Sequence, residues 1–99
     1  MKSIYTPEAQ ILGQLIRTVR VEMNLSQADV ARGIGKAQSY ISKIESGELM
    51  IDAVILVYIC RAMDIRFSDF ALRWERLLNE QVRSRDADAD TPNYLLGIA

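Results

Sequence analysis

The most constraining feature of the chain is a stretch of two short amphipathic segments, residues 25–47, LSQADVARGIGKAQSYISKIESG. Ser26 suits the N-cap of a helix over residues 27–34, and Asp29 three positions later suits a capping box. Glycines flank the end of this segment, and a second short helix is expected over residues 37–45. The inward apolar positions of both segments have helical spacing: Val30, Ala31, Ile34, Ile41 and Ile44. Two short helices joined by such a tight turn meet at a steep angle and leave the second one protruding.

The remainder of the chain also has helical rather than alternating periodicity. With Thr6 as N-cap, a helix is expected from Pro7 to about Met23. Asp52 should cap a fourth helix ending near Met63, and a fifth is expected over residues 67–83. The inward apolar residues expected in these three helices are Leu12, Leu15, Ile16, Val19 and Met23, then Ala53, Leu56, Ile59, Cys60 and Met63, and finally Phe67, Phe70, Trp74, Leu77 and Leu78. The predicted fold class is therefore all-α, with about five helices.

Composition argues against several classes of protein and of site. The 99 residues are the size of one domain, and the longest apolar run, residues 53–60, is far shorter than the ~20 residues of a membrane-spanning helix. The first residues lack the apolar stretch of a signal peptide, so we expect a cytoplasmic protein. The sequence has no histidine and one cysteine, Cys60, which the pattern predicts to be a buried thiol. We expect no enzymatic activity, no metal site, no cofactor and no small-molecule ligand.

Net charge by itself does not point to a nucleic acid, because 12 Lys and Arg stand against 13 Asp and Glu. The distribution is more informative than the total. Residues 1–50 hold six basic and five acidic side chains, whereas residues 51–99 hold six and eight. The excess acid lies in SRDADADT, residues 84–91, which has the composition of a polar linker. A local balance of +1 still predicts weak non-specific affinity for DNA.

Residues 9–70 resemble the Xre-type helix-turn-helix family, which is also called phage-repressor-like or lambda-repressor-like. The matching residues are Leu25-Ser26-Gln27, Val30-Ala31, Ile34-Gly35, Tyr40-Ile41-Ser42, Ile44-Glu45 and Gly47, with further matches in residues 12–20 and 59–63. The resemblance implies a five-helix domain that binds double-stranded DNA through its second short helix. The DNA-binding residues that it implies are Gln27, Lys36, Gln38, Ser39, Tyr40 and Lys43.

These residue types have the chemistry that the resemblance requires. Gln38 and Ser39 would start the recognition helix and meet base edges, where a glutamine can pair bidentately with adenine. Gln27 would donate its amide to a phosphate or a base edge, and Lys43 would reach guanine or phosphate. Lys36 would contact the DNA backbone. The competing interpretation is that these polar side chains are only the solvated surface of short helices.

Two further residues of the segment have alternative interpretations. Tyr40 would contact sugar-phosphate or pack locally. Glu45 is expected to hold a structural ion pair with Arg20 rather than to take part in catalysis.

The region after Gly47 departs from the family pattern, in which basic residues or a proline are frequent. Here the acidic Glu48 is followed by three apolar residues, 49–51, that require burial. The fourth helix carries a second apolar arc beside its core side, made of Ile51, Val54, Ile55 and Tyr58. A helix that is apolar on two sides must be covered on both, which points to a partner.

We expect this second arc to meet its two-fold mate in a homodimer. The expected interface residues are Ile51, Val54, Ile55, Tyr58, Trp74, Leu78, Tyr94 and Leu95. The alternative is a larger core in one chain, in which the fifth helix or the apolar residues 92–99 cover the arc. The expected division is a helix-turn-helix domain with its dimerisation helix over residues 1–83, followed by an acidic linker and apolar tail over residues 84–99.

Two functional hypotheses follow. The first is a sequence-specific transcription regulator, bacterial or phage, that acts as a homodimer on an inverted-repeat operator, since such modules read two half-sites. The second is a protein-binding antiactivator or antitoxin that keeps the helix-turn-helix fold and has an activator or a toxin as its partner. The negative total charge, Glu48 and the apolar surface of the fourth helix favour the second hypothesis.

Overall fold

The computed structural model describes residues 6–84, and these form five helices and no strand. The helices are α1 (Pro7–Glu22), α2 (Gln27–Gly33), α3 (Gln38–Glu45), α4 (Ala53–Ala62) and α5 (Phe67–Ser84). The predicted all-α class and the helix number are therefore confirmed. The linker and tail were expected over residues 84–99. Ser84 is instead the last residue of α5, and residues 85–99 lie outside the described part of the chain.

Local capping signals explain where three of the helices begin. The hydroxyl of Thr6 accepts a hydrogen bond from the backbone N–H of Ala9 at 3.1 Å, and Pro7 follows at the first helical position. Ser26 forms the predicted capping box, in which its hydroxyl accepts from the N–H of Asp29 and its own N–H donates to the Asp29 carboxylate. The carboxylate of Asp52 caps α4 by accepting from the N–H of Ile55 at 2.8 Å.

The start of α3 differs from the prediction by one residue. Ala37 has an extended backbone, with φ −75° and ψ 153°, so it is the N-cap and not the first helical residue. Alanine has no side-chain acceptor for a cap hydrogen bond. The chain enters this cap from the turn between α2 and α3, where Gly35 has φ +69° and the N–H of Lys36 donates to the Ala31 carbonyl at 2.9 Å.

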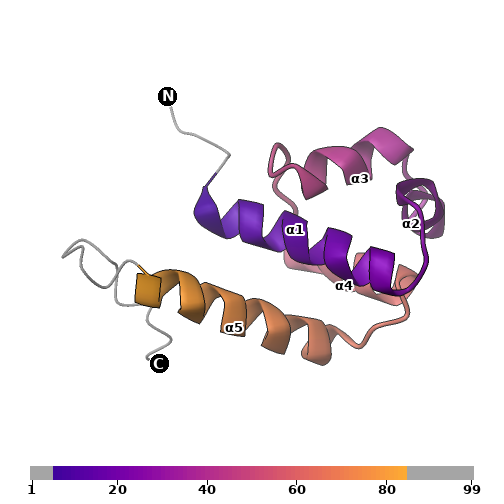
Figure 1. Cartoon of the computed structure of the whole chain (residues 1–99). Helices are drawn as coiled ribbons and strands as arrows, with labels where there is room; N and C mark the ends of the chain where they lie inside the picture. Colours follow the sequence, from indigo (N-terminus) through magenta and orange to yellow (C-terminus); the bar gives the residue numbers. More distant parts are fainter. Residues whose placement is uncertain (1–5, 85–99) are drawn as a thin grey trace.

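The five helices form a layered arrangement in which α1 lies between the other elements (Figure 1). α1 and α5 lie side by side and run in opposite directions, so the end of α5 lies beside the start of α1. α3 packs on α1, and α2 contacts both α3 and α4. The pair α2 and α3 therefore stands together at one end of the molecule, with α2 beside the last turn of α1.

The core contains apolar side chains from all five helices. The largest fully buried side chains are Phe70, Ile16, Ile41, Ile44, Ile59, Met63, Val19, Val30 and Cys60. Cys60 is a free, fully buried thiol, so the prediction of a buried cysteine is confirmed, and this burial raises its pKa to about 11.

Four residues that the sequence pattern predicted as buried are exposed. Met23 follows the last turn of α1, Met50 lies in the loop before α4, and Phe67 is the first residue of α5. Ala53, the first residue of α4, is also exposed. All four lie at helix ends or in a loop, where the neighbouring helices no longer cover the side that a helical wheel places inward.

None of the five helices within residues 6–84 is long and apolar enough to cross a membrane.

Candidate nucleic-acid interface

The surface of α3 divides into a buried side and an exposed side. Ile41 and Ile44 point into the core, whereas Gln38, Ser39 and Lys43 are exposed. This side of α3 is held outward because its other side packs on both α1 and α2. The predicted protruding helix is therefore present, with its first turn carrying Gln38 and Ser39.

A buried ion pair fixes the far end of α3 to α1. The Glu45 side chain is 4% exposed and accepts two hydrogen bonds from Arg20, at 2.7 Å from Nε and 3.0 Å from Nη2. Arg20 also donates from Nη1 to the Leu25 carbonyl at 2.9 Å, which ties the start of α2 to the same pair. Hydrogen bonding to Glu45 raises the pKa of the Arg20 guanidinium. The predicted ion pair is confirmed, and its bidentate geometry is the strong form of such pairs.

The same carboxylate orients Gln27. Nε2 of Gln27 donates to Oε1 of Glu45 at 3.0 Å. Because an ionised carboxylate can only accept hydrogen bonds, the Gln27 amide must turn its nitrogen toward Glu45. Its oxygen then faces α3 and accepts a hydrogen bond from Nε2 of Gln38 at 2.5 Å. The side chain that was expected to donate to DNA is thus engaged within the protein and positions its neighbour.

Gln38 keeps a free acceptor and a free donor at the surface. Its Nε2 uses one of two hydrogens on Gln27, and its Oε1 makes no hydrogen bond within residues 6–84. One acceptor beside one donor is the pattern that matches the N6–H and N7 edge of adenine in the major groove. The arrangement can therefore present a fixed amide to a base pair.

The other predicted contact residues surround this amide. The side chains of Ser39 and Lys43 are exposed and make no hydrogen bond or ion pair in the described part of the chain. The Lys36 ammonium lies 5.2 Å from the centroid of the half-buried Tyr40 ring, a cation–π contact that steadies both side chains. The structure thus brings all six predicted residues to the α2–α3 end of the molecule.

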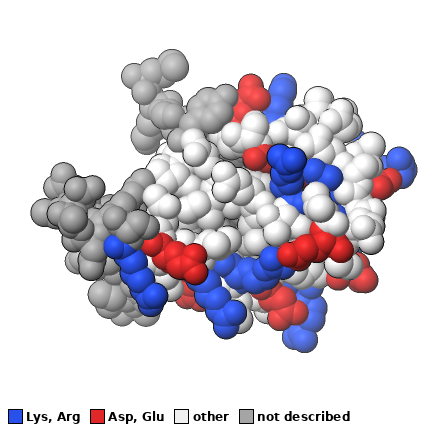
Figure 2. Space-filling model, viewed as in Figure 1, with Lys and Arg blue, Asp and Glu red and all other residues white. Residues whose placement is uncertain are grey.

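Several of the charged side chains near the site are already paired with one another. Arg32 lies 3.2 Å from Asp29, whose pKa is lowered chiefly by the backbone N–H of Ser26. Arg73 donates two hydrogen bonds to Glu22, which lowers the pKa of that carboxyl. Along α5, blue and red side chains alternate at the lower edge of the molecule (Figure 2). Lys36 and Lys43 belong to the turn before α3 and to α3 itself, and neither forms an ion pair within residues 6–84.

The predicted interface residues fall into three groups. Val54 and Tyr58 are exposed by 58% and 47%, one turn apart on α4. Ile51, Ile55 and Trp74 are half-buried and pack against the core, and Leu78 is half-buried. Tyr94 and Leu95 lie outside the described residues. The fifth helix and the core thus cover part of the second arc within one chain, and the remainder is open.

The pairing of Gln27 with Gln38 and with Glu45 was not foreseen from the sequence. These residues are far apart along the chain, and their meeting depends on how α2 and α3 cross. The sequence offers only one signal for this pairing: Gln27 and Gln38 are polar residues in the first turns of α2 and α3, and Glu45 is a polar residue at the end of α3.

Comparison with known proteins supports the fold. A helix-turn-helix family model matches residues 16–70. Two crystal structures of the clp gene regulator ClgR from Corynebacterium glutamicum are similar in fold. One has a TM-score of 0.72 at 18% identity, with 84% of this chain and 88% of that chain covered, and the other 0.65 at 19%, with 74% and 94% covered. No curated protein matches the sequence. Since the family model spans more than half of the chain, this protein belongs to the helix-turn-helix family of Xre or lambda-repressor-like type, a family of DNA-binding transcription regulators.

Proposed function

We propose that the protein is a sequence-specific transcription regulator that binds an inverted-repeat DNA operator as a homodimer. The observation that carries this proposal is the exposed amide of Gln38, held in one orientation by Gln27 and the buried Glu45. A solvated surface glutamine would gain nothing from such a chain of hydrogen bonds. Base recognition gains from these hydrogen bonds, because a preoriented amide loses less conformational entropy on binding.

The remaining contacts follow from the position of α3. With its first turn in the major groove, Gln38 and Ser39 meet base edges. Lys43, one turn further on, reaches guanine or phosphate, while Lys36 and Tyr40 meet the sugar-phosphate backbone. Phosphate contacts position the helix, and Gln38 supplies the discrimination between bases.

The homodimer is proposed because one α3 helix reads only a few base pairs. Two modules related by a two-fold axis read two half-sites about one helical turn of DNA apart. Val54 and Tyr58 provide an exposed apolar surface on α4 that a second copy of the chain can cover.

The proposal predicts that Gln38→Ala lowers affinity for the preferred operator by about 1–3 kcal/mol, roughly 5- to 150-fold. The operator is first obtained by selection from random duplexes and from the protein's own promoter region. The variant should also lose the preference for adenine at one position of each half-site, and its unfolding midpoint should stay within the wild-type range.

Gln14→Ala is the matched control, since Gln14 is an exposed glutamine of α1 that lies outside the α2–α3 site. It should leave operator affinity unchanged. Affinity of the wild type should fall steeply with salt, because phosphate contacts release counterions. Absence of DNA binding at low salt, or equal effects of the two variants, would overturn the proposal.

The alternative is a protein-binding role as an antiactivator or antitoxin. The exposed pair Val54 and Tyr58 and the near-neutral charge favour it. The salt titration separates the two functions, because a purely protein-binding module would show no steep salt-dependent affinity for DNA.

A further inference from the structure

A small cavity lies between the start of α1, the loop before α4 and the middle of α5. Its volume is about 190 Å³, and its walls include Ala9, Leu12, Ile44, Leu49, Ile51 and Trp74. The walls are mainly apolar, and the side chains of Leu12, Leu49 and Ile51 join it to the core. A cavity of this size accommodates one or two aliphatic side chains.

Trp74, which lines this cavity, has a buried hydrogen-bond donor without an acceptor. Its indole Nε1 is buried and has no hydrogen-bond partner. It is the one such side-chain nitrogen or oxygen atom in residues 6–84. An unpaired buried donor is costly, and native proteins almost always supply an acceptor or a water. The site therefore calls for an occupant that combines apolar side chains with a hydrogen-bond acceptor.

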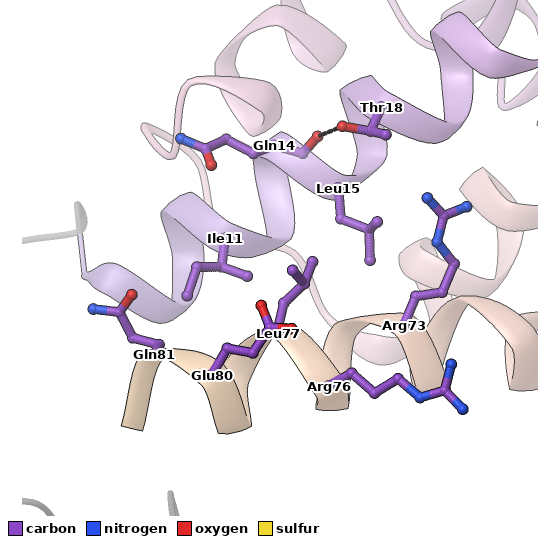
Figure 3. A pocket seen from close by; sticks show the side chains of 9 residues that line it. All are labelled: Ile11, Gln14, Leu15, Thr18, Arg73, Arg76, Leu77, Glu80 and Gln81. Atoms are coloured by element: carbon purple, nitrogen blue, oxygen red, sulfur yellow. Dashed lines mark hydrogen bonds between the residues drawn. The ribbon is translucent and has the colours of Figure 1, made fainter. Parts of the chain in front are cut away.

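A second, larger pocket has, among the described residues that line it, no buried polar side-chain atom without a partner and so does not point to an occupant in the same way. It lies between α1 and α5, measures about 600 Å³, and has Leu15 and Leu77 at its floor (Figure 3). Gln14, Thr18, Arg73, Arg76, Glu80 and Gln81 surround that floor. Arg73 is engaged with Glu22, and no buried polar side-chain atom of this hollow lacks a partner.

The chain that follows α5 is long enough to reach the cavity. From Trp74 to Ser84 the helix extends roughly 15 Å, and its end lies beside the first turns of α1, which form one wall of the cavity. Residues 85–91 can span up to about 23 Å when extended, a length sufficient for residues 92–99 to reach Trp74. These last residues, PNYLLGIA, are apolar after a polar and acidic linker.

We propose that residues 92–99 of the same chain occupy this cavity, with Leu95 and Leu96 against its apolar walls and a backbone carbonyl of the segment accepting the Trp74 N–H. Backbone carbonyls are the acceptors that an apolar segment always carries. Since Ile44 of α3 lines the same cavity, the docked segment braces the recognition helix from behind. This intramolecular contact is independent of whether the protein binds DNA.

The single tryptophan of the chain makes the test direct. In the full-length protein, nuclear Overhauser contacts should connect the Trp74 indole proton to the methyl groups of Leu95 or Leu96. The double variant Leu95→Asp/Leu96→Asp should lose these contacts. Its indole N–H should exchange with solvent about tenfold faster or more, and its fluorescence should shift to longer wavelength.

The matched control is Asn93→Asp/Gly97→Asp, which adds the same two charges to the same segment and keeps both leucines. It should retain the indole contacts. Indole contacts to residues 1–5, or contacts that cross between labelled and unlabelled molecules in a mixed sample, would overturn the proposal. So would an indole proton that exchanges equally fast in the wild type and the leucine variant.

Discussion

Glu45 has two roles because its buried carboxylate accepts hydrogen bonds from both Arg20 and Gln27. The first partner joins α3 to α1, and the second determines which end of the Gln27 amide faces Gln38. A buried charge such as that of Glu45 costs much free energy unless it is paired, so the carboxylate can orient Gln27 only while Arg20 neutralises it. The Glu45 side chain therefore contributes both to the stability of the fold and to the orientation of the Gln38 amide that we propose reads a base.

At this scale we predict that Glu45→Gln lowers the free energy of unfolding by about 3–5 kcal/mol, because the Arg20 charge stays buried without its partner. Urea denaturation measures the loss. The same variant should weaken discrimination at the adenine position, since a glutamine at position 45 can also donate and no longer fixes the Gln27 amide. Arg20→Met/Glu45→Leu, which removes both charges, should lose less stability than Glu45→Gln. A cost below about 1 kcal/mol for Glu45→Gln would contradict this account.

At the scale of elements, the angle of α3 depends on how closely it approaches α1. Gly13 is buried at this crossing, and a Cβ there would overlap the Ile44 carbonyl oxygen and lie 2.7 Å from that of Glu45. Backbone atoms cannot move aside as a flexible side chain can. The glycine is therefore required by space and not by its own dihedral angles.

Gly13→Ala is expected to destabilise the protein by about 1–3 kcal/mol, although alanine is the better helix former, because α3 must shift outward. Thermal and urea unfolding measure the change, and operator affinity should fall with it as Gln38 moves. Gln14→Ala, on the exposed side of the same helix, should leave stability within about 0.5 kcal/mol of wild type. Stabilisation by Gly13→Ala would show that the two helices separate without cost.

Helix boundaries could be predicted from the sequence where a side chain caps its own helix. Thr6, Ser26 and Asp52 are local signals, and the structure places each at its predicted N-cap. Ala37 gives no such signal, and the predicted start of α3 was one residue early. The contrast between exposed Val54 and half-buried Ile55 depends on the rotation of α4 against α5, which a helical wheel does not contain. The link from Gln27 to Gln38 likewise needs the crossing of two helices.

At the scale of the whole molecule, the α2–α3 end and α4 have different surfaces. The α2–α3 end carries the polar site around Gln38, and α4 carries exposed Val54 and Tyr58. Since α2 packs on α4, the two surfaces belong to one rigid framework. In the proposed homodimer, a two-fold contact through α4 would set the separation and orientation of the two α3 helices, and the spacing of the operator half-sites would have to match them.

We predict that Val54→Asp/Tyr58→Asp converts the protein from a dimer to a monomer, because burying four carboxylates across a two-fold axis is strongly unfavourable. Light scattering at micromolar concentration should report half the wild-type mass, with unchanged helix content by circular dichroism. Operator affinity should fall by roughly 100-fold or more, since the second half-site no longer binds from the same complex. Leu72→Asp is the control: Leu72 is 46% exposed on α5, outside the predicted interface, and its variant should remain dimeric. A double variant that keeps the dimer mass would place the two-fold contact elsewhere. A monomeric wild type would mean that there is no two-fold contact. In the second case the exposed pair on α4 becomes the surface of the protein-binding alternative.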